Sequence, residues 1–176
     1  MDNQWLKTLS SVTMIVVFIL AAFDLYLWRY FPRAITKRPN LHGTWKAKLE
    51  STWVSGETGE AVSKHFYLVV RQTFSSITVT SLYDIARSQS TSAGLAEHNG
   101  TCELSYIYWS AAKTTKRTGN PPHRGAAALV ISSEPTLSMA GDYWTERDGG
   151  KGTIATLGRS KKIYDSFDAA EEGVYV

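Results

Sequence analysis

Two patterns of apolar and polar residues divide the 176-residue chain. Residues 12–31, VTMIVVFILAAFDLYLWRYF, form an almost unbroken apolar run, whereas the chain beyond Pro39 alternates between apolar and polar positions. The first pattern is typical of a helix in apolar surroundings, and the second is typical of half-buried strands. We therefore predict two parts: residues 1–38, an anchor followed by a basic linker, and residues 39–176, a strand-rich domain.

The alternating region predicts eight strands separated by short turns. Glycine, asparagine, aspartate or proline marks most of these turns, and helical periodicity does not intervene between the strands. This succession predicts an all-β fold, an eight-stranded antiparallel up-and-down barrel of the lipocalin-like kind, whose interior is either filled by side chains or able to hold one small ligand. The expected strands are 43–53, 64–73, 76–83, 85–93, 100–111, 125–133, 136–146 and 151–159.

The apolar run is long enough to cross a bilayer, because 20 helical residues rise about 30 Å, the thickness of the hydrocarbon core. We expect a transmembrane helix. A cleaved signal peptide and a helix buried in a soluble core are the alternatives, but the run outlasts a signal-peptide core and the strands can build a core of their own. The residues expected in the membrane include Val12, Ile15, Phe18, Leu20, Asp24 and Trp28.

The flanks of this helix predict its orientation. Basic residues favour the cytoplasmic side of a membrane, and aromatic residues such as Trp28 favour its interface. We therefore expect a single-pass protein whose barrel faces the cytoplasm. The basic residues on the C-terminal flank are Arg29, Arg33, Lys37 and Arg38.

Asp24 is the discordant residue of the apolar run. A carboxylate is costly in lipid and usually faces water or a protein partner. Two interpretations stay open. Either the helix is shifted by a turn and Asp24 reaches the headgroups, or the helix self-associates and Asp24 meets a polar group of another copy.

Composition excludes several classes of function. A formal charge of +3, from 19 basic and 16 acidic residues, is too even to predict binding to a DNA or RNA duplex. Four scattered histidines and one cysteine give no metal-ligand spacing. The chain also lacks the glycine-rich and nucleophile motifs of common enzymes. We expect no metal, no cofactor and no catalytic residues, and hence no enzyme.

Three short motifs accompany the predicted architecture: Leu41-x-Gly43-x-Trp45, Gly141-x-Tyr143-x-Thr145-x-Arg147 and Gly152-x-Ile154. Together with the N-terminal apolar segment, they make the chain resemble the membrane-anchored β-barrel effectors of CBASS, the bacterial cyclic-oligonucleotide antiphage system. The resemblance covers nearly the whole chain. Members of that family typically carry two transmembrane helices, whereas this chain has room for one. The Gly-x-Trp motif is also similar to that of lipocalin-like barrels, in which the tryptophan plugs one end.

The resemblance implies an antiphage defence effector in the bacterial inner membrane. Its barrel would bind a cyclic dinucleotide made by a partner nucleotidyltransferase. Binding would drive homo-oligomerisation, and the clustered membrane segments would disrupt the lipid bilayer and cause abortive infection. A ligand shifts such an equilibrium by its preference for the assembled form, without making or breaking a bond.

Ligand-binding residues are predicted from chemical type. Phosphates are recognised by arginine, and bases stack on aromatic rings. Tyr143, Thr145 and Arg147 share one face of a strand, which either lines the wet mouth of the barrel or emerges at its surface. Trp45 is expected to plug the core. The candidate ligand-binding residues are Arg147, Arg71, Tyr106, Tyr143 and Thr145.

Two other functions stay open. One is a membrane-tethered lipocalin-like carrier of an apolar small molecule, which requires an apolar lumen. The other is a membrane scaffold with a filled barrel. The acidic tail 166–176 is expected to be frayed or loosely packed.

Overall fold

A computed structural model describes residues 4–54, 61–114 and 121–176, which form two compact units. One unit contains the chain up to Asn40 together with the Gln72–Ser76 turn, and the other contains Leu41–Arg71 and Ile77–Val176. Along the chain the division falls between Asn40 and Leu41, close to the predicted boundary at residues 38 and 39.

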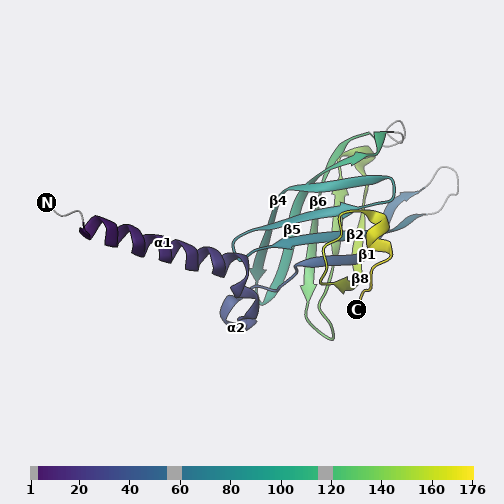
Figure 1. Cartoon of the computed structure of the whole chain (residues 1–176). Coiled ribbons are helices and arrows are strands. Elements are labelled where there is room, and N and C mark those ends of the chain that lie inside the picture. Colours follow the sequence, from purple (N-terminus) through teal and green to yellow (C-terminus); the bar gives the residue numbers. More distant parts are fainter. Residues whose placement is uncertain (1–3, 55–60, 115–120) are drawn as a thin grey trace. The chain divides into compact units, whose positions relative to one another are not determined.

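The second unit contains the strands of a closed antiparallel barrel, and neighbouring strands follow the order of the sequence around it (Figure 1). The predicted all-β, eight-stranded antiparallel barrel is therefore confirmed. The strands are β1 (Gly43–Val54), β2 (Ala61–Gln72), β3 (Ile77–Leu82), β4 (Ala86–His98), β5 (Thr101–Ala112), β6 (His123–Ser132), β7 (Ser138–Thr145) and β8 (Lys151–Ser160).

Glycines of two sequence motifs lie where the barrel closes between β1 and β8. Gly43 has a φ of 142°, in the range that favours glycine, and a Cβ there would collide with the carbonyl of Ser160. Gly152 pairs with Ser51, and a Cβ on Gly152 would collide with the carbonyl of Glu50. The two glycines thus allow the first and last strands to approach closely.

Alternate residues of each strand fill the barrel, as the period-two pattern predicts. In β5, for example, Cys102, Leu104 and Tyr106 are buried, whereas Thr101, Ser105 and Ile107 are exposed. One core cluster joins residues from all around the barrel: Leu41, Trp45, Ala47, Phe66, Leu68, Val70, Val79, Cys102, Leu104, Tyr106, Ala127, Leu129, Ile131, Met139, Tyr143 and Ile154. The interior is therefore filled by side chains, most of them apolar.

The C-terminal segment packs on the barrel, so the prediction of a frayed tail was wrong. Ser166 caps the short helix α3 (Phe167–Glu171; Figure 1, yellow) by accepting a hydrogen bond from the N–H of Ala169 at 3.2 Å. Ala170 is fully buried against Tyr67 of β2 and Leu82 of β3. The acidic residues of the tail obscured this packing in the sequence, because the apolar residues that make it are spread over 163–175. Those that join the cluster are Ile163, Tyr164, Phe167 and Tyr175.

The first unit contains α1 (Gln4–Leu25), the 3-10 turn η1 (Leu27–Tyr30) and α2 (Arg33–Thr36). Large apolar side chains of α1 are exposed, including Val12, Ile15, Phe18 and Leu20. Within the described part of the chain, no helix combines the length and the apolar character that crossing a bilayer requires.

The α-helix ends earlier than the apolar run because Asp24 is bonded elsewhere. The backbone carbonyl of Asp24 accepts a 2.9 Å hydrogen bond from the N–H of Phe74, and its carboxylate accepts one of 2.7 Å from the N–H of Ser75. Thr73 Oγ1 lies 3.4 Å from the same carboxylate oxygen. Asp24 therefore has partners in its own chain, an arrangement different from the two that the sequence left open.

The Phe74 ring is the centre of this contact. It meets the ring of Phe23 edge-on at 5.2 Å and that of Trp28 at 6.3 Å. Arg38 lies 5.3 Å from the centre of the Phe74 ring and donates a 2.8 Å hydrogen bond to the Phe74 carbonyl. Trp28 is consequently buried, with 1% of its surface exposed. We call residues 23–38 with the Gln72–Ser76 turn the turn clasp.

Candidate functional site

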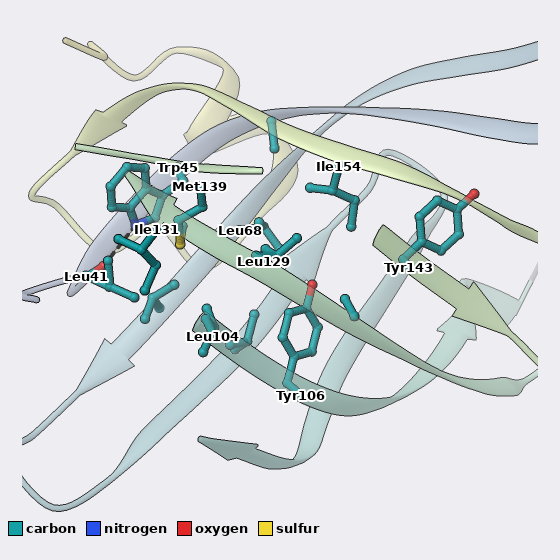
Figure 2. Close-up of a cluster of buried hydrophobic side chains, with 14 of the residues drawn as sticks. Leu41, Trp45, Leu68, Leu104, Tyr106, Leu129, Ile131, Met139, Tyr143 and Ile154 are labelled. Carbon is teal, nitrogen blue, oxygen red and sulfur yellow. Dashed lines mark hydrogen bonds between the residues drawn. The ribbon is translucent and has the colours of Figure 1, made fainter. Parts of the chain in front are cut away.

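The two ends of the barrel interior differ in chemistry. Figure 2 shows Leu41, Trp45, Ile131 and Met139 gathered at one end. Trp45 is fully buried and its Nε1 donates to the Leu41 carbonyl at 2.9 Å, which confirms the predicted plug. The Arg159 guanidinium lies 5.0 Å from the centre of the Trp45 ring. This end is therefore closed by an apolar plug with a cation stacked on it.

Tyrosines gather toward the opposite end. Figure 2 shows Tyr106 of β5 and Tyr143 of β7 there, away from Trp45. The rings of Tyr106 and Tyr108 lie 6.1 Å apart, and Tyr83, which follows β3, stacks on Phe66 at 4.8 Å. Strands β5 and β7 and the segment after β3 thus place aromatic rings and hydroxyl groups at a single end of the interior.

A row of serines lies beside the tyrosines. Ser81 of β3 pairs with Ser88 of β4, and Ser88 pairs with Ser110 of β5. All three serines are buried. The Ser81 hydroxyl is hydrogen-bonded to the phenols of Tyr83 and Tyr106. The register of three strands therefore places these serine hydroxyl groups side by side. We call this part of the barrel the hydroxyl end; its residues are Ser81, Ser88, Ser110, Tyr83, Tyr106, Tyr108, Tyr143 and Thr145.

Gly125 makes room for Tyr108 in this group. Gly125 of β6 pairs with Tyr108 on one side and with Thr145 of β7 on the other. A Cβ at Gly125 would collide with the Tyr108 phenol and with the carbonyl of Trp144. Because the position lacks a side chain, the Tyr108 ring lies across β6 and its hydroxyl bonds to the Thr145 side chain.

Burial raises the pKa values of these phenols. It raises the pKa of Tyr108 to about 12 and those of Tyr83 and Tyr106 further above the ordinary value of tyrosine. Neighbouring tyrosines add to each shift, and the hydrogen bonds from Ser81 and Thr145 oppose it. At neutral pH the hydroxyl end therefore offers uncharged donors and acceptors.

The structure brings four of the five predicted ligand residues to this end. Tyr106 and Tyr143 are buried there, and Thr145 ends β7 beside them. Arg147 lies in the turn η3 (Arg147–Gly149) that follows, where its N–H donates to Thr145 Oγ1 at 3.3 Å. Arg71 lies apart, because it points outward near the plugged end and pairs with Asp165 at 2.8 Å.

Sequence reasoning missed the serine row, Tyr83 and the role of Gly125. Alternation places Val79, Ser81 and Tyr83 on one face of the chain, but it does not say which strand lies opposite. Only the register shows that Ser81 and Ser88 are neighbours. A glycine opposite a tyrosine is likewise meaningful only once the strands are paired.

The hydroxyl end has the chemistry to hold a polar ligand with flat rings. Hydroxyl groups bond to base edges and phosphate oxygens, and phenol rings stack on bases. Among the residues that the structure describes, the buried polar side chains are uncharged: Thr44, Gln72, Thr80, Ser81, Ser88 and Ser110. Phosphate charge would therefore be met at the rim, where Arg147 lies. The described residues contain no group of acidic, histidine or cysteine side chains arranged to bind a metal ion.

Comparison with known proteins identifies the family to which this barrel is similar. The family described as "Cap15, cyclic dinucleotide receptor domain" matches residues 36–158. The match begins before β1 and ends within β8, so it includes the hydroxyl end and Arg147.

Two curated proteins are similar over most of the chain. CD-NTase-associated protein 15 of Escherichia albertii is 28% identical over 164 residues, covering 90% of this chain and 82% of the relative. CD-NTase-associated protein 15 of Staphylococcus schleiferi is 25% identical over 142 residues, covering 80% of this chain and 74% of the relative. Both alignments extend beyond the length of the matched receptor domain.

Proposed function

The chain belongs to the Cap15 cyclic dinucleotide receptor family, and from this premise we propose that it is a CBASS effector that senses a cyclic dinucleotide at the hydroxyl end of its barrel. The ligand comes from a partner nucleotidyltransferase, in line with the CD-NTase association in the names of both relatives. Binding promotes homo-oligomerisation of a membrane-anchored chain and disrupts the inner membrane.

The observation that carries this proposal is the one-sided distribution of polar groups in the barrel. One end is closed by Trp45, and the other carries the tyrosines, the serine row and Arg147. A cyclic dinucleotide presents two flat bases and two phosphodiesters. Phenol rings such as Tyr106 and Tyr143 suit the bases, hydroxyl groups suit the base edges, and Arg147 suits one phosphate.

Packing of the core determines where the ligand enters. The side chains of Leu68, Leu104 and Leu129 are fully buried in the middle of the barrel. Close-packed interiors leave little free volume. We therefore assign the ligand to the hydroxyl end and its rim, with rearrangement of Tyr143 and the η3 turn on binding.

Membrane anchoring is the second part of the proposal. Its support is the exposure of large apolar side chains along α1, for example 74% for Phe18 and 62% for Leu20. Contact between such an apolar surface and water is unfavourable, whereas lipid or another copy of the helix would bury the surface. With basic residues after the helix, the barrel faces the cytoplasm.

A scaffold with a filled barrel is the second candidate, because the packed core favours it. An apolar-ligand carrier is disfavoured by the hydroxyl groups of Ser81, Ser88 and Ser110 at the hydroxyl end. No bond-making step is part of either proposal, and we propose that the protein is not an enzyme and needs no cofactor.

The test measures the thermal stability and mass of the detergent-solubilised full chain with a panel of cyclic dinucleotides. A compound that binds only the folded protein raises its stability by about 2.7 kcal/mol at 100 times its Kd. We expect one compound to stabilise the protein and increase its mass, and Arg147→Ala to weaken both effects.

Arg71→Ala is the matched control, since Arg71 lies on the outer face and pairs with Asp165. It should leave ligand binding unchanged. If every compound leaves both mass and stability unchanged, the sensing function fails and the scaffold replaces it.

A further inference from the structure

The barrel leaves one outer apolar face uncovered. On the opposite side, α3 and the tail cover Tyr67, Val69 and Leu82. Among the described residues of the barrel strands, the large apolar side chains that are exposed all lie on β5–β8. They are Ile107, Trp109, Val130, Trp144 and Leu157.

Pairing across β5, β6 and β7 gives this surface its shape. Ala126 of β6 lies between Ile107 of β5 and Trp144 of β7. The next outward residue of β6, Ala128, again has a small side chain. Small side chains thus follow one another along the outer side of β6. Ile107 and Trp144 flank them at Ala126, and Ser105 and the exposed Asp142 flank them at Ala128. We call Ile107, Trp109, Ala126, Ala128, Val130 and Trp144 the β5–β7 face.

Opposite charges lie at opposite ends of the β5–β7 face. Arg124 pairs with Trp109 at one end, with its guanidinium 5.8 Å from the centre of a Trp109 ring. Glu103 pairs with Val130 at the other end. The two charges are six residues apart along β5 and β6, so they cannot pair within one copy. Asp142, which pairs with Ala128, lies in the Glu103 half of the face, whereas the Glu146 carboxylate lies at the Arg124 end and accepts a 2.7 Å hydrogen bond from the Arg124 N–H. A single face therefore carries both halves of an ion pair.

We propose that the β5–β7 face binds the same face of a second copy of this chain. A two-fold axis in the interface, running across the strands between Ala126 and Ala128, brings Arg124 of each copy to the Glu103 end of the partner. An axis along β6 would instead set Arg124 against its own equivalent. Charge complementarity thus selects the first arrangement, in which a self-complementary patch closes a dimer.

The residue types at this face are those that dominate protein interfaces. Tryptophan and arginine are enriched among residues that contribute most to binding, and the small alanines of β6 leave room for larger side chains of a partner. This inference rests on the proposed function only in that assembly accompanies sensing. It identifies the surface of the barrel that makes the assembly.

The test is a charge exchange in the full chain, solubilised in detergent. Arg124→Glu and Glu103→Arg each put like charges together across the axis, whereas the double variant restores opposite charges. We expect each single variant to weaken self-association by about tenfold or more, and the double variant to recover most of the loss. Lys161→Glu is the control, because Lys161 is an exposed cation in the bend after β8, outside this face.

Sedimentation is measured over a range of protein concentrations, first without ligand and then with each cyclic dinucleotide, and ligand binding is measured separately by calorimetry. The proposal that the β5–β7 face is the interface is overturned if both single variants associate as strongly as the parent chain. It is also overturned if the parent chain never associates. A double variant that associates more weakly than either single variant overturns it too.

The outcomes separate this inference from the proposed function. If the chain binds no cyclic dinucleotide, but the single charge variants weaken its association and the double variant restores it, the sensing function fails and the proposed dimer contact stands. If ligand binds and drives assembly equally well in the Arg124→Glu and Glu103→Arg variants, the proposed dimer contact is overturned and the sensing function stands. If Arg124→Glu reduces binding to anionic-lipid vesicles while self-association is unchanged, a bilayer occupies the face and the inference is overturned.

Discussion

The carboxylate of Asp24 accepts a 2.7 Å hydrogen bond from the backbone N–H of Ser75. Asp24 lies in the last turn of α1, and Ser75 lies in the turn that joins β2 to β3. Both residues belong to the unit that contains α1, and this bond helps to hold the turn clasp together within that unit.

Replacement of Asp24 by alanine should loosen this turn. The N–H of Ser75 loses its acceptor, and we expect the amides of residues 72–76 to exchange with deuterium faster than in the parent chain. Glu97→Ala, at an exposed carboxylate of β4, is the matched control and should leave these amides unchanged. Equal exchange rates in Asp24→Ala and the parent would show that the aromatic contacts of Phe74 hold the turn without Asp24.

Replacement of Gly125 by alanine should destabilise the barrel. The new methyl group meets the Tyr108 phenol and the Trp144 carbonyl, and overpacking of this kind costs about 1–3 kcal/mol. For a protein of this size, Tm should fall by about 2–4 °C per kcal/mol. The loss should be smaller in a Tyr108→Ala background, which frees space, than in Tyr108→Phe, which keeps the ring. Identical losses in both backgrounds would argue against this collision.

Two tryptophans should differ strongly in how much stability their truncation costs. Trp45→Ala removes a fully buried ring and its hydrogen bond to Leu41, and should cost about 3–5 kcal/mol of unfolding free energy. Trp144→Ala removes a ring that is 52% exposed and should change the stability of the monomer by less than about 1 kcal/mol. Urea unfolding of both variants checks the contrast. A large loss for Trp144→Ala in the monomer would mean that this residue serves the fold.

The hydroxyl end predicts a loss of stability at alkaline pH. An exposed tyrosine has a pKa near 10, whereas burial raises the pKa of Tyr108 to about 12. The folded state thus holds its proton more tightly, so the stabilisation is complete below about pH 10 and is lost as pH rises through about pH 12. Burial shifts the pKa of Tyr106 in the same direction.

The measurement is the free energy of unfolding in urea from about pH 9 to about pH 12. Tyr108→Phe should give a shallower decline than the parent, because it removes one titrating group. An ultraviolet titration of the folded protein in which all tyrosines ionise near pH 10 would contradict the assignment.

Alternation alone was sufficient to predict the barrel. A closed antiparallel sheet buries every second residue, so the strands could be located before their partners were known. The same alternation placed Tyr143 and Thr145 on one face, and the structure brings both to the hydroxyl end. The similarity of Gly43-x-Trp45 to the motif of lipocalin-like barrels implied that Trp45 is a plug, and it is fully buried.

What the sequence could not provide depends on contacts between distant segments. Ser88 and Ser110 are separated by a hairpin, and only the register of β4 and β5 sets them side by side. Trp28 has the flanks of an interfacial residue, yet it packs on Phe74, which lies in a turn far along the chain. Arg71 has the right chemistry for a phosphate, but the parity of β2 points it outward, to Asp165.

The number of apolar faces that the barrel leaves exposed limits how many partners it can bind. The tail occupies the apolar surface over Tyr67 and Leu82, so the β5–β7 face is the apolar surface that the described strands leave for a partner. An interface in which both copies use the same surface is fully occupied in a dimer. Barrels alone would therefore stop at two copies, and any larger array must be cross-linked through a second contact, for which the exposed apolar side chains of α1 are available. On the proposed dimer contact, α1 would set the number of copies in a larger assembly, whereas the barrel would set only whether two neighbours pair.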